Sequence, residues 1–178
     1  MKTSNQLNNN TVVGTVMTNL SLEKYLNSLG INLNRVNVGD RYILDEMINN
    51  DYNLGGEPSG HVLLTNHSKT GDGLLTAIKV ISLLKKSGLQ ASEFLRPFKM
   101  TPYKIKNINQ VDNKILDNSI VKNKIKDFNK QLSDNGRILV RPSGTESLIR
   151  ILVESKEKSL IDKYLTKVSE ILDQNIKK

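Results

Sequence analysis

The strongest constraint on the fold is an alternation of strand-like and helix-like segments through residues 11–87. The first strand is predicted at 11–17 (TVVGTVM), where β-branched and apolar residues form a short run. Segments with leucine and isoleucine at helical spacing then alternate with further short apolar runs. In chain order we expect helix 20–29, strand 31–38, helix 41–50, strand 62–65 and helix 70–87. This alternation predicts an α/β layer built on a parallel or mixed sheet.

A different pattern follows two proline breaks, Arg96-Pro97 and Thr101-Pro102. It predicts a strand, a helix, two short strands and a last helix capped by Ser159, which is the make-up of a small α+β domain. The expected ranges are 103–108, 113–133, 137–140, 148–154 and 159 onward. We therefore expect two domains, an α/β domain at 1–95 and an α+β domain at 96–178.

Composition excludes several classes of protein. The chain has no cysteine and only two histidines, which excludes a disulfide framework and a cysteine-based zinc site. No apolar run approaches the roughly 20 residues that a membrane-spanning helix needs. The polar start also lacks the apolar segment of a secretory signal. We expect a cytoplasmic protein without a membrane partner.

The net charge of +8 lies entirely in the second half. Residues 1–95 hold eight basic and eight acidic side chains, whereas residues 96–178 hold eighteen and ten. Aromatic residues make up only 4% of the chain and are scattered, so no platform for stacking nucleic-acid bases is predicted. We do not expect a nucleic-acid partner. A basic half is also suited to attracting a small anionic substrate.

Glycine placement indicates the first candidate site. Five of the eleven glycines lie between residues 55 and 73, in NLGGEPSGHVLL and KTGDGLL. Glycines around Glu57 and Ser59 would hold a carboxylate and a hydroxyl on a tight loop, an arrangement that suits the vicinal hydroxyls of a sugar. An ordinary glycine-rich turn explains the same spacing, so the residues alone leave both interpretations open.

The second candidate site is the segment RPSGTE, which begins at Arg141. An arginine fork, the hydroxyls of Ser143 and Thr145, and a turn at Gly144 place several anion donors within five residues, as a phosphate site requires. The alternative is a Pro-Ser-Gly turn beside a surface arginine.

Five segments together resemble the α-D-phosphohexomutase superfamily, and within it the phosphoglucosamine mutases. They are NTVVGTVMTNLSLEKYL at 10–26, VGDRYI at 38–43, GGEPSGH at 55–61, TGDGL at 70–74 and RPSGTESLIR at 141–150. Their order and spacing match from about residue 10 to the end. The resemblance implies the family's third and fourth domains, and the interconversion of glucosamine 6-phosphate and glucosamine 1-phosphate for cell-wall precursors.

The resemblance assigns roles only to matching positions. It implies that Glu57 and Ser59 contact sugar hydroxyls, and that the substrate's non-reacting phosphate is held by Arg141, Ser143, Gly144 and Thr145. Weaker candidates are Asp40 and Arg41 in a turn that faces the active site, His61 in the sugar loop, and Arg150 beyond the phosphate loop.

Other parts of the family's machinery find no match in the sequence. The resemblance implies a phosphoserine in a TASHNP-like loop, a Mg²⁺ held by a DGDxDR-like loop and a sugar bisphosphate primer, and neither loop occurs here. The helix that opens the family's third domain is also unmatched, which predicts an uncovered apolar face on the first sheet. We therefore expect no catalytic residue and no metal in this chain.

These observations leave three hypotheses. The first is the C-terminal half of a mutase, which binds a hexosamine phosphate and needs the missing N-terminal half as its partner. The second is a binding module without chemistry, or a remnant of a split gene. The third and weakest is a basic nucleic-acid binder, which would require strongly salt-dependent binding to DNA.

Overall fold

The computed structural model describes residues 6–109, 111–144 and 146–176. Its internal contacts separate the chain into a first unit, Met1–Met100, and a second unit, Thr101–Lys178. No helix in the described part of the chain is long and apolar enough to cross a membrane.

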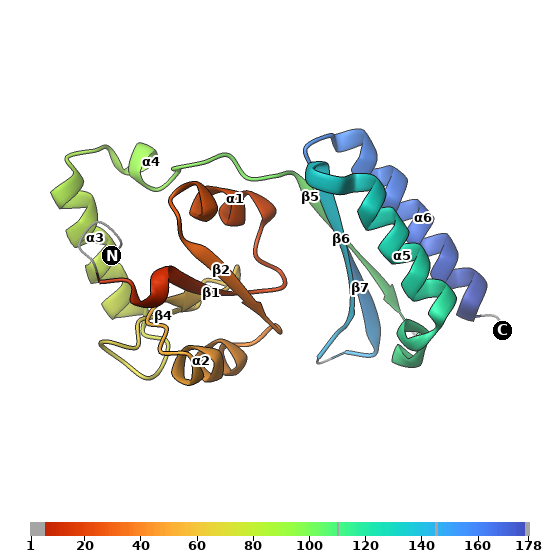
Figure 1. Cartoon of the computed structure of the whole chain (residues 1–178), viewed down its shortest axis with the longest axis horizontal. Helices are drawn as coiled ribbons and strands as arrows, with labels where there is room; N and C mark the ends of the chain where they lie inside the picture. The colour runs from red at the N-terminus through yellow and green to blue at the C-terminus, as the bar shows by residue number, and fades with distance from the viewer. Residues whose placement is uncertain (1–5, 110, 145, 177–178) are drawn as a thin grey trace. The chain divides into compact units, whose positions relative to one another are not determined.

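The first unit is a four-stranded sheet with helices on both faces (Figure 1). The strand order is β2-β1-β3-β4, where β1 (Thr11–Thr15) runs parallel to β2 (Asn32–Val36) and β3 (Gly55–Gly56), and β4 (Val62–Leu63) runs antiparallel to β3. Helices α1 (Leu20–Ser28) and α2 (Asp40–Asn49) lie on opposite faces of this sheet (Figure 1). The expected α/β class with a mixed sheet is confirmed.

Two small apolar clusters hold this sheet to its helices. On the α2 face, Val13, Ile43, Met47 and Leu63 are almost fully buried. On the α1 face the buried cluster comprises Leu7, Leu26 and Ile31. The expected helix at 20–29 is confirmed: Asn19 caps its first turn by accepting from the amide of Ser21 at 3.0 Å, and the chain reverses at Gly30 with φ 64°.

The strand β3 was not expected, because paired glycines usually indicate a turn. A Cβ on Gly55 would lie 2.6 Å from Cγ2 of Ile43 and 2.7 Å from Sδ of Met47. The bare backbone therefore lets α2 pack directly onto the middle of the sheet. The expected strand at 62–65 is shortened to two residues, so the sheet is narrow on this side.

Helix α3 (Gly73–Ser87) has the expected apolar stripe, but the stripe is not buried. The structure describes α3 throughout, and none of its residues is buried; Leu74, Ile78 and Ile81 are 73%, 59% and 63% exposed. The helix starts at Gly73 and not at 70, because Asp72 caps it by accepting from the amide of Leu75 at 2.9 Å. It ends at Gly88, whose φ is 70°. The short helix α4 (Ala91–Phe94) follows.

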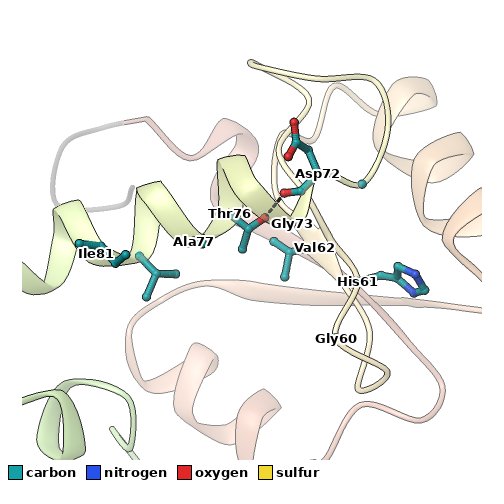
Figure 2. Close-up of a pocket in the computed structure, with 10 residues that line it drawn as sticks. Gly60, His61, Val62, Asp72, Gly73, Thr76, Ala77 and Ile81 are labelled. Carbon is teal, nitrogen blue, oxygen red and sulfur yellow. Dashed lines mark hydrogen bonds between the residues drawn. The ribbon is translucent and has the colours of Figure 1, made fainter.

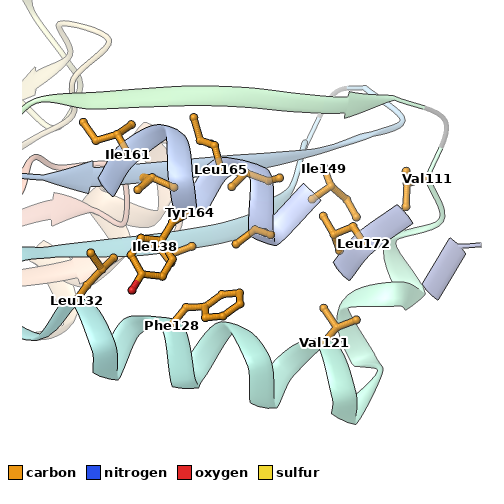
Figure 3. Close-up of a cluster of buried hydrophobic side chains, with 13 residues drawn as sticks. Val111, Val121, Phe128, Leu132, Ile138, Ile149, Ile161, Tyr164, Leu165 and Leu172 are labelled. Atoms are coloured by element: carbon orange, nitrogen blue, oxygen red, sulfur yellow. The ribbon is translucent and has the colours of Figure 1, made fainter. Parts of the chain in front are cut away.

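The second unit is a three-stranded antiparallel sheet with two helices on one face (Figure 3). The order is β5-β7-β6, with β5 (Tyr103–Asn109) and β6 (Gly136–Pro142) on either side of β7 (Leu148–Ser155). Thirteen buried side chains form one cluster. They come from β6, β7, α5 (Ser119–Leu132) and α6 (Lys158–Ile176), together with Val111 in the segment after β5. The expected α+β class is confirmed.

Two details of the second unit differ from the sequence prediction. The helix expected at 113–133 is divided into a 3-10 turn, Asn113–Asp117, and α5, because Asn118 adopts an extended conformation and caps α5 through its side chain. The last helix begins at Lys158, so Ser159 lies inside its first turn and the predicted cap is wrong. Asp162 instead pairs with Lys104 of β5, with Oδ1 and Nζ 2.7 Å apart.

Candidate functional site

The first candidate site is the loop that joins β3 to β4. The amide of Glu57 donates to the carbonyl of His61 at 3.0 Å, and the amide of Gly60 donates to the carbonyl of Glu57 at 3.1 Å. Gly60 has a φ of 100°, a conformation that side chains disfavour. The loop is therefore a closed turn that fixes the directions of Glu57, Ser59 and His61.

These three side chains form a hydrogen-bonded triangle. Oε1 of Glu57 accepts from Oγ of Ser59 at 2.7 Å and lies 3.0 Å from Nδ1 of His61, and the Ser59 and His61 atoms are also 3.0 Å apart. The Glu57 side chain is 9% exposed, whereas the His61 ring is 57% exposed. A carboxylate held in place beside a hydroxyl and an imidazole can accept from ligand hydroxyl groups without first losing side-chain entropy.

Two hollows of the first unit adjoin this loop. One, of about 460 Å³, lies between the loop and α3 and is lined by Gly60, Val62, Asp72, Thr76 and Ile81, among others. Figure 2 shows Asp72 accepting from the Thr76 hydroxyl through its carbonyl, at 2.8 Å, while the His61 ring points away from α3. The aspartate of TGDGL thus caps and anchors a helix.

The other hollow is an apolar groove of about 410 Å³ on the α1 face of the sheet. Its walls come from α1, from the sheet and from the segment that follows α4, and Glu57 and His61 border it. The apolar lining includes Val12, Leu22, Leu26, Leu33, Leu54, Phe98 and Met100. Most of the side chains that line this groove are apolar. The uncovered sheet face expected from the sequence stays a prediction.

Among the described residues, no hydrogen bond or ion pair joins the turn at Gly39 to the loop that carries Glu57 and Ser59. Asp40 begins α2 and accepts from the amide of Arg41 at 2.8 Å. The Arg41 side chain is 88% exposed, and its Nε lies 3.8 Å from Asp45 in the next turn. Local contacts therefore account for both side chains, and their expected place at an active site stays a prediction.

The second candidate site is the turn between β6 and β7. The amide of Ser143 donates to the carbonyl of Leu148 at 2.9 Å, which closes the turn, and Ser143 is buried while Gly144 is exposed. Thr145 lies outside the described residues. Arg141 and Arg150 are directly opposite each other on the two paired strands. Strand pairing thus brings together two cations that are nine positions apart in sequence.

Part of the hydrogen-bonding capacity of the two guanidinium groups is unused among the described residues. Nε of Arg141 and Nε of Arg150 are buried and have no hydrogen-bond partner within the described residues. Burial, and then the nearby charge of Arg150, lower the pKa of Arg141. Because buried donors without partners and adjacent like charges both cost free energy, the arrangement favours an anion that would supply acceptors and negative charge.

Glu146 lies in the RPSGTE segment, but the sequence assigned it no role. Oε2 of Glu146 accepts from Nη2 of Arg150 at 2.8 Å. The only sequence signal was the four-residue spacing of an acidic and a basic side chain, which is usually interpreted on helices and not across the end of a loop.

Metal ligands are not clustered in the part of the chain that the structure describes. Among those residues, no group of three or more histidine, aspartate or glutamate side chains could hold a metal ion. The residues of both candidate sites therefore do not fit a Mg²⁺ centre.

Comparison with known proteins places both units in one family. The family model for phosphoglucomutase/phosphomannomutase, α/β/α domain III, matches residues 1–100, and the model for the C-terminal domain of the same family matches residues 104–171. The phosphoglucosamine mutase of Oceanobacillus iheyensis is 40% identical over 171 residues, which are 96% of this chain and 38% of the relative. That of Agrobacterium fabrum is 43% identical over 161 residues, 90% of this chain and 36% of the relative.

Solved structures show the same fold. The N-acetylphosphoglucosamine mutase of Aspergillus fumigatus superposes with a TM-score of 0.81 at 18% identity, over 93% of this chain and 38% of that protein. An N-acetylglucosamine-phosphate mutase of the α-D-phosphohexomutase superfamily superposes with a TM-score of 0.75 at 19% identity, over 90% and 38%. The chain thus spans less than two fifths of the length of these relatives. With both units matched to its domain models, the chain belongs to the phosphoglucomutase/phosphomannomutase family.

Proposed function

We propose that this chain supplies the sugar-phosphate-binding part of a phosphoglucosamine mutase, which interconverts glucosamine 6-phosphate and glucosamine 1-phosphate. The observation that carries the proposal is the pair Arg141 and Arg150 beside the RPSG turn, whose buried Nε donors have no hydrogen-bond partner among the residues that the structure describes. The relatives that match most of this chain at 40% identity or more bear the name of this enzyme.

In this proposal the second unit holds the substrate's non-reacting phosphate. Arg141 donates charge-assisted hydrogen bonds from its guanidinium group, and Ser143 and Gly144 contribute donors from the turn. Thr145 is proposed for the same site from its sequence position alone. Holding the distal phosphate fixes the substrate at a point remote from the reacting bond, and this binding energy can be used to orient the sugar.

The first unit is proposed to recognise the sugar ring. Oε1 of Glu57, already held by Ser59 and His61, would accept from ring hydroxyls, and Ser59 can turn its hydroxyl toward the ligand. The triangle supports this role because it fixes a carboxylate before any ligand arrives. Asp40 and Arg41 are weaker candidates for contact with the substrate.

The remaining chemistry is assigned to the part of the relatives that this chain does not match. Phosphoryl transfer requires a nucleophile and an electrostatic clamp on the transferring group. We assign the phosphoserine, the Mg²⁺ and the response to a sugar bisphosphate primer to sequence that matches the rest of the relatives' length. The exposed stripe of α3 and the apolar groove support a protein partner, because contiguous apolar side chains left exposed often mark a protein contact. Cell-wall precursor synthesis in the cytoplasm is the proposed setting.

The second candidate function is a sugar-phosphate-binding module that performs no chemistry. The same two loops would give it affinity for a hexosamine phosphate. The two functions differ in whether a partner restores turnover, and not in whether the ligand binds.

The test is conversion of glucosamine 6-phosphate by the purified chain, with and without the N-terminal part of the Oceanobacillus iheyensis relative, Mg²⁺ and a sugar bisphosphate. We expect turnover only in the complete mixture, and its loss when Arg141→Gln replaces the wild type. Arg96→Gln, which removes an exposed arginine of the first unit, is the matched control. Binding without turnover in any mixture would favour the binding module. Turnover by the chain alone would overturn the proposal.

A further inference from the structure

The paired arginines are neutralised only in part. Arg141 and Arg150 face each other across β6 and β7, at a position where like charges destabilise a sheet. Nη1 of Arg141 donates to the carbonyl of Pro142 at 3.1 Å, and Nη2 of Arg150 donates to Glu146. The described contacts of these guanidinium groups thus include one carboxylate for two positive charges.

The turn delivers that carboxylate to Arg150. The amide of Leu148 donates to the carbonyl of Glu146 at 2.9 Å, so the backbone of Glu146 is fixed at the end of the turn. Its side chain remains 56% exposed, and that of Arg150 is 33% exposed. The ion pair is therefore accessible to water, and an exposed pair of this kind contributes little free energy. A ligand with more negative charge can displace it.

We propose that Glu146 is a positioning residue, which holds Arg150 until a phosphate dianion binds and then releases it to the phosphate. The inference rests on the proposed function of the RPSG turn as a phosphate site. A phosphate ester carries between about 1.5 and 2 negative charges at neutral pH and offers three acceptor oxygens. It therefore balances two guanidinium groups better than one carboxylate does. Glu146 competes with the ligand for Arg150 and so weakens phosphate binding.

The alternative is that Glu146 only closes the turn. A glutamate with that role would support the binding site, and replacing it would leave phosphate affinity unchanged or reduce it. The two roles therefore predict opposite signs for the same substitution.

The experiment is calorimetric titration of the whole chain with inorganic phosphate at neutral pH. Glu146→Gln keeps the shape of the side chain and removes its charge, and we expect phosphate to bind about two- to fivefold more tightly, the range of an exposed ion pair. Glu170→Gln, on the exposed side of α6, makes the same change in net charge and should leave the affinity at the wild-type value.

The same substitution in a protein that already carries Arg150→Gln distinguishes two effects of Glu146, competition for Arg150 and general electrostatic repulsion of the phosphate. When Arg150→Gln is already present, Glu146→Gln should give no further gain, because no ion pair remains to be broken. A gain that persists in this background, or an affinity that is unchanged or weaker in Glu146→Gln alone, would overturn the inference and leave the phosphate site standing. If wild-type protein did not bind phosphate, the proposed function would fail, and the inference with it.

Discussion

The two units differ in how completely they bury their apolar side chains. The second unit gathers thirteen buried residues into one cluster between a sheet and two helices. The first unit divides its core between clusters of four and three residues and leaves α3 without a buried side chain. The second unit therefore has one continuous core, whereas the first leaves more of its apolar side chains exposed.

The two candidate sites also differ in how far their polar side chains are already paired. In the first unit, Glu57 is already bound by Ser59 and His61, so its loop is organised before a ligand arrives. In the second unit, a well-packed sheet carries two arginines whose Nε donors have no partner among the described residues. The unit with the larger buried cluster therefore carries the site whose charges are less well paired, and its packing can offset the free-energy cost of that site.

The largest expected effects come from matched substitutions in the two cores. Ile43→Ala and Ile151→Ala each remove a fully buried side chain, one from the four-residue cluster and one from the thirteen-residue cluster. Such changes lower the free energy of unfolding by about 2–5 kcal/mol. We expect Ile151→Ala toward the upper end and Ile43→Ala toward the lower, because the smaller cluster can relax toward solvent.

Native-state amide hydrogen exchange measures both losses, since it follows β7 and β1 separately within the same chain. A larger loss for Ile43→Ala than for Ile151→Ala would mean that the first unit is the better packed of the two.

Two glycines allow a comparison of backbone constraints. A Cβ on Gly136 would meet the backbone carbonyl of Glu154, whereas a Cβ on Gly55 would meet the side chains of Ile43 and Met47. Backbone cannot move aside as a flexible methionine can. We expect Gly136→Ala to destabilise more than Gly55→Ala, within the range of about 1–3 kcal/mol for overpacking.

Thermal unfolding measured by circular dichroism gives the order of the two variants. Gly73→Ala is the control, because its Cβ enters open space at the start of α3 and should be neutral or slightly stabilising. If Gly55→Ala and Gly136→Ala lowered the thermal stability equally, the expected difference between backbone crowding at Gly136 and side-chain crowding at Gly55 would be wrong.

The smallest effect on stability is expected at the exposed face of α3. Replacing Ile78 and Ile81 together by Gln should change the free energy of unfolding by no more than about 0.5 kcal/mol per site, since neither side chain is buried. Binding of a hydrophobic fluorescent dye should fall clearly. Ile120→Gln, at a residue of α5 that is 56% exposed, should change dye binding less. A loss of stability above about 2 kcal/mol would show that this face of α3 is buried in solution.

The sequence predicts the main elements of both units because their signals are local. The apolar stripe of α5 depends on neighbours within one or two helical turns. The caps at Asn19 and Asp72 are equally local, but the sequence analysis did not predict them. Two features escape prediction because distant residues decide them. Gly55 enters a strand only because α2 packs against it, and the exposure of α3 depends on what covers the helix.

In the candidate sites too, the sequence predicts contacts between residues that are close in sequence and not those set by strand pairing. Glu57 and Ser59 are close in sequence, and the structure brings them together as expected. Arg141 and Arg150 meet only through the register of β6 and β7, and spacing alone could not establish that register. The role of Glu146 as the partner of Arg150 depends on that pairing, and so the sequence did not indicate it.

We propose a division of labour, in which the second unit binds phosphate and the first recognises the sugar. Its most direct test is calorimetry of wild type, Arg141→Ala and Glu57→Gln, each titrated with inorganic phosphate and with glucosamine 6-phosphate. Arg141→Ala should weaken the binding of both ligands by about 1.5–3 kcal/mol, which is the contribution of a hydrogen bond to a charged group. Glu57→Gln should weaken only the sugar phosphate. Equal affinity of wild type and Arg141→Ala for phosphate, or equal losses for both ligands in Glu57→Gln, would contradict the account.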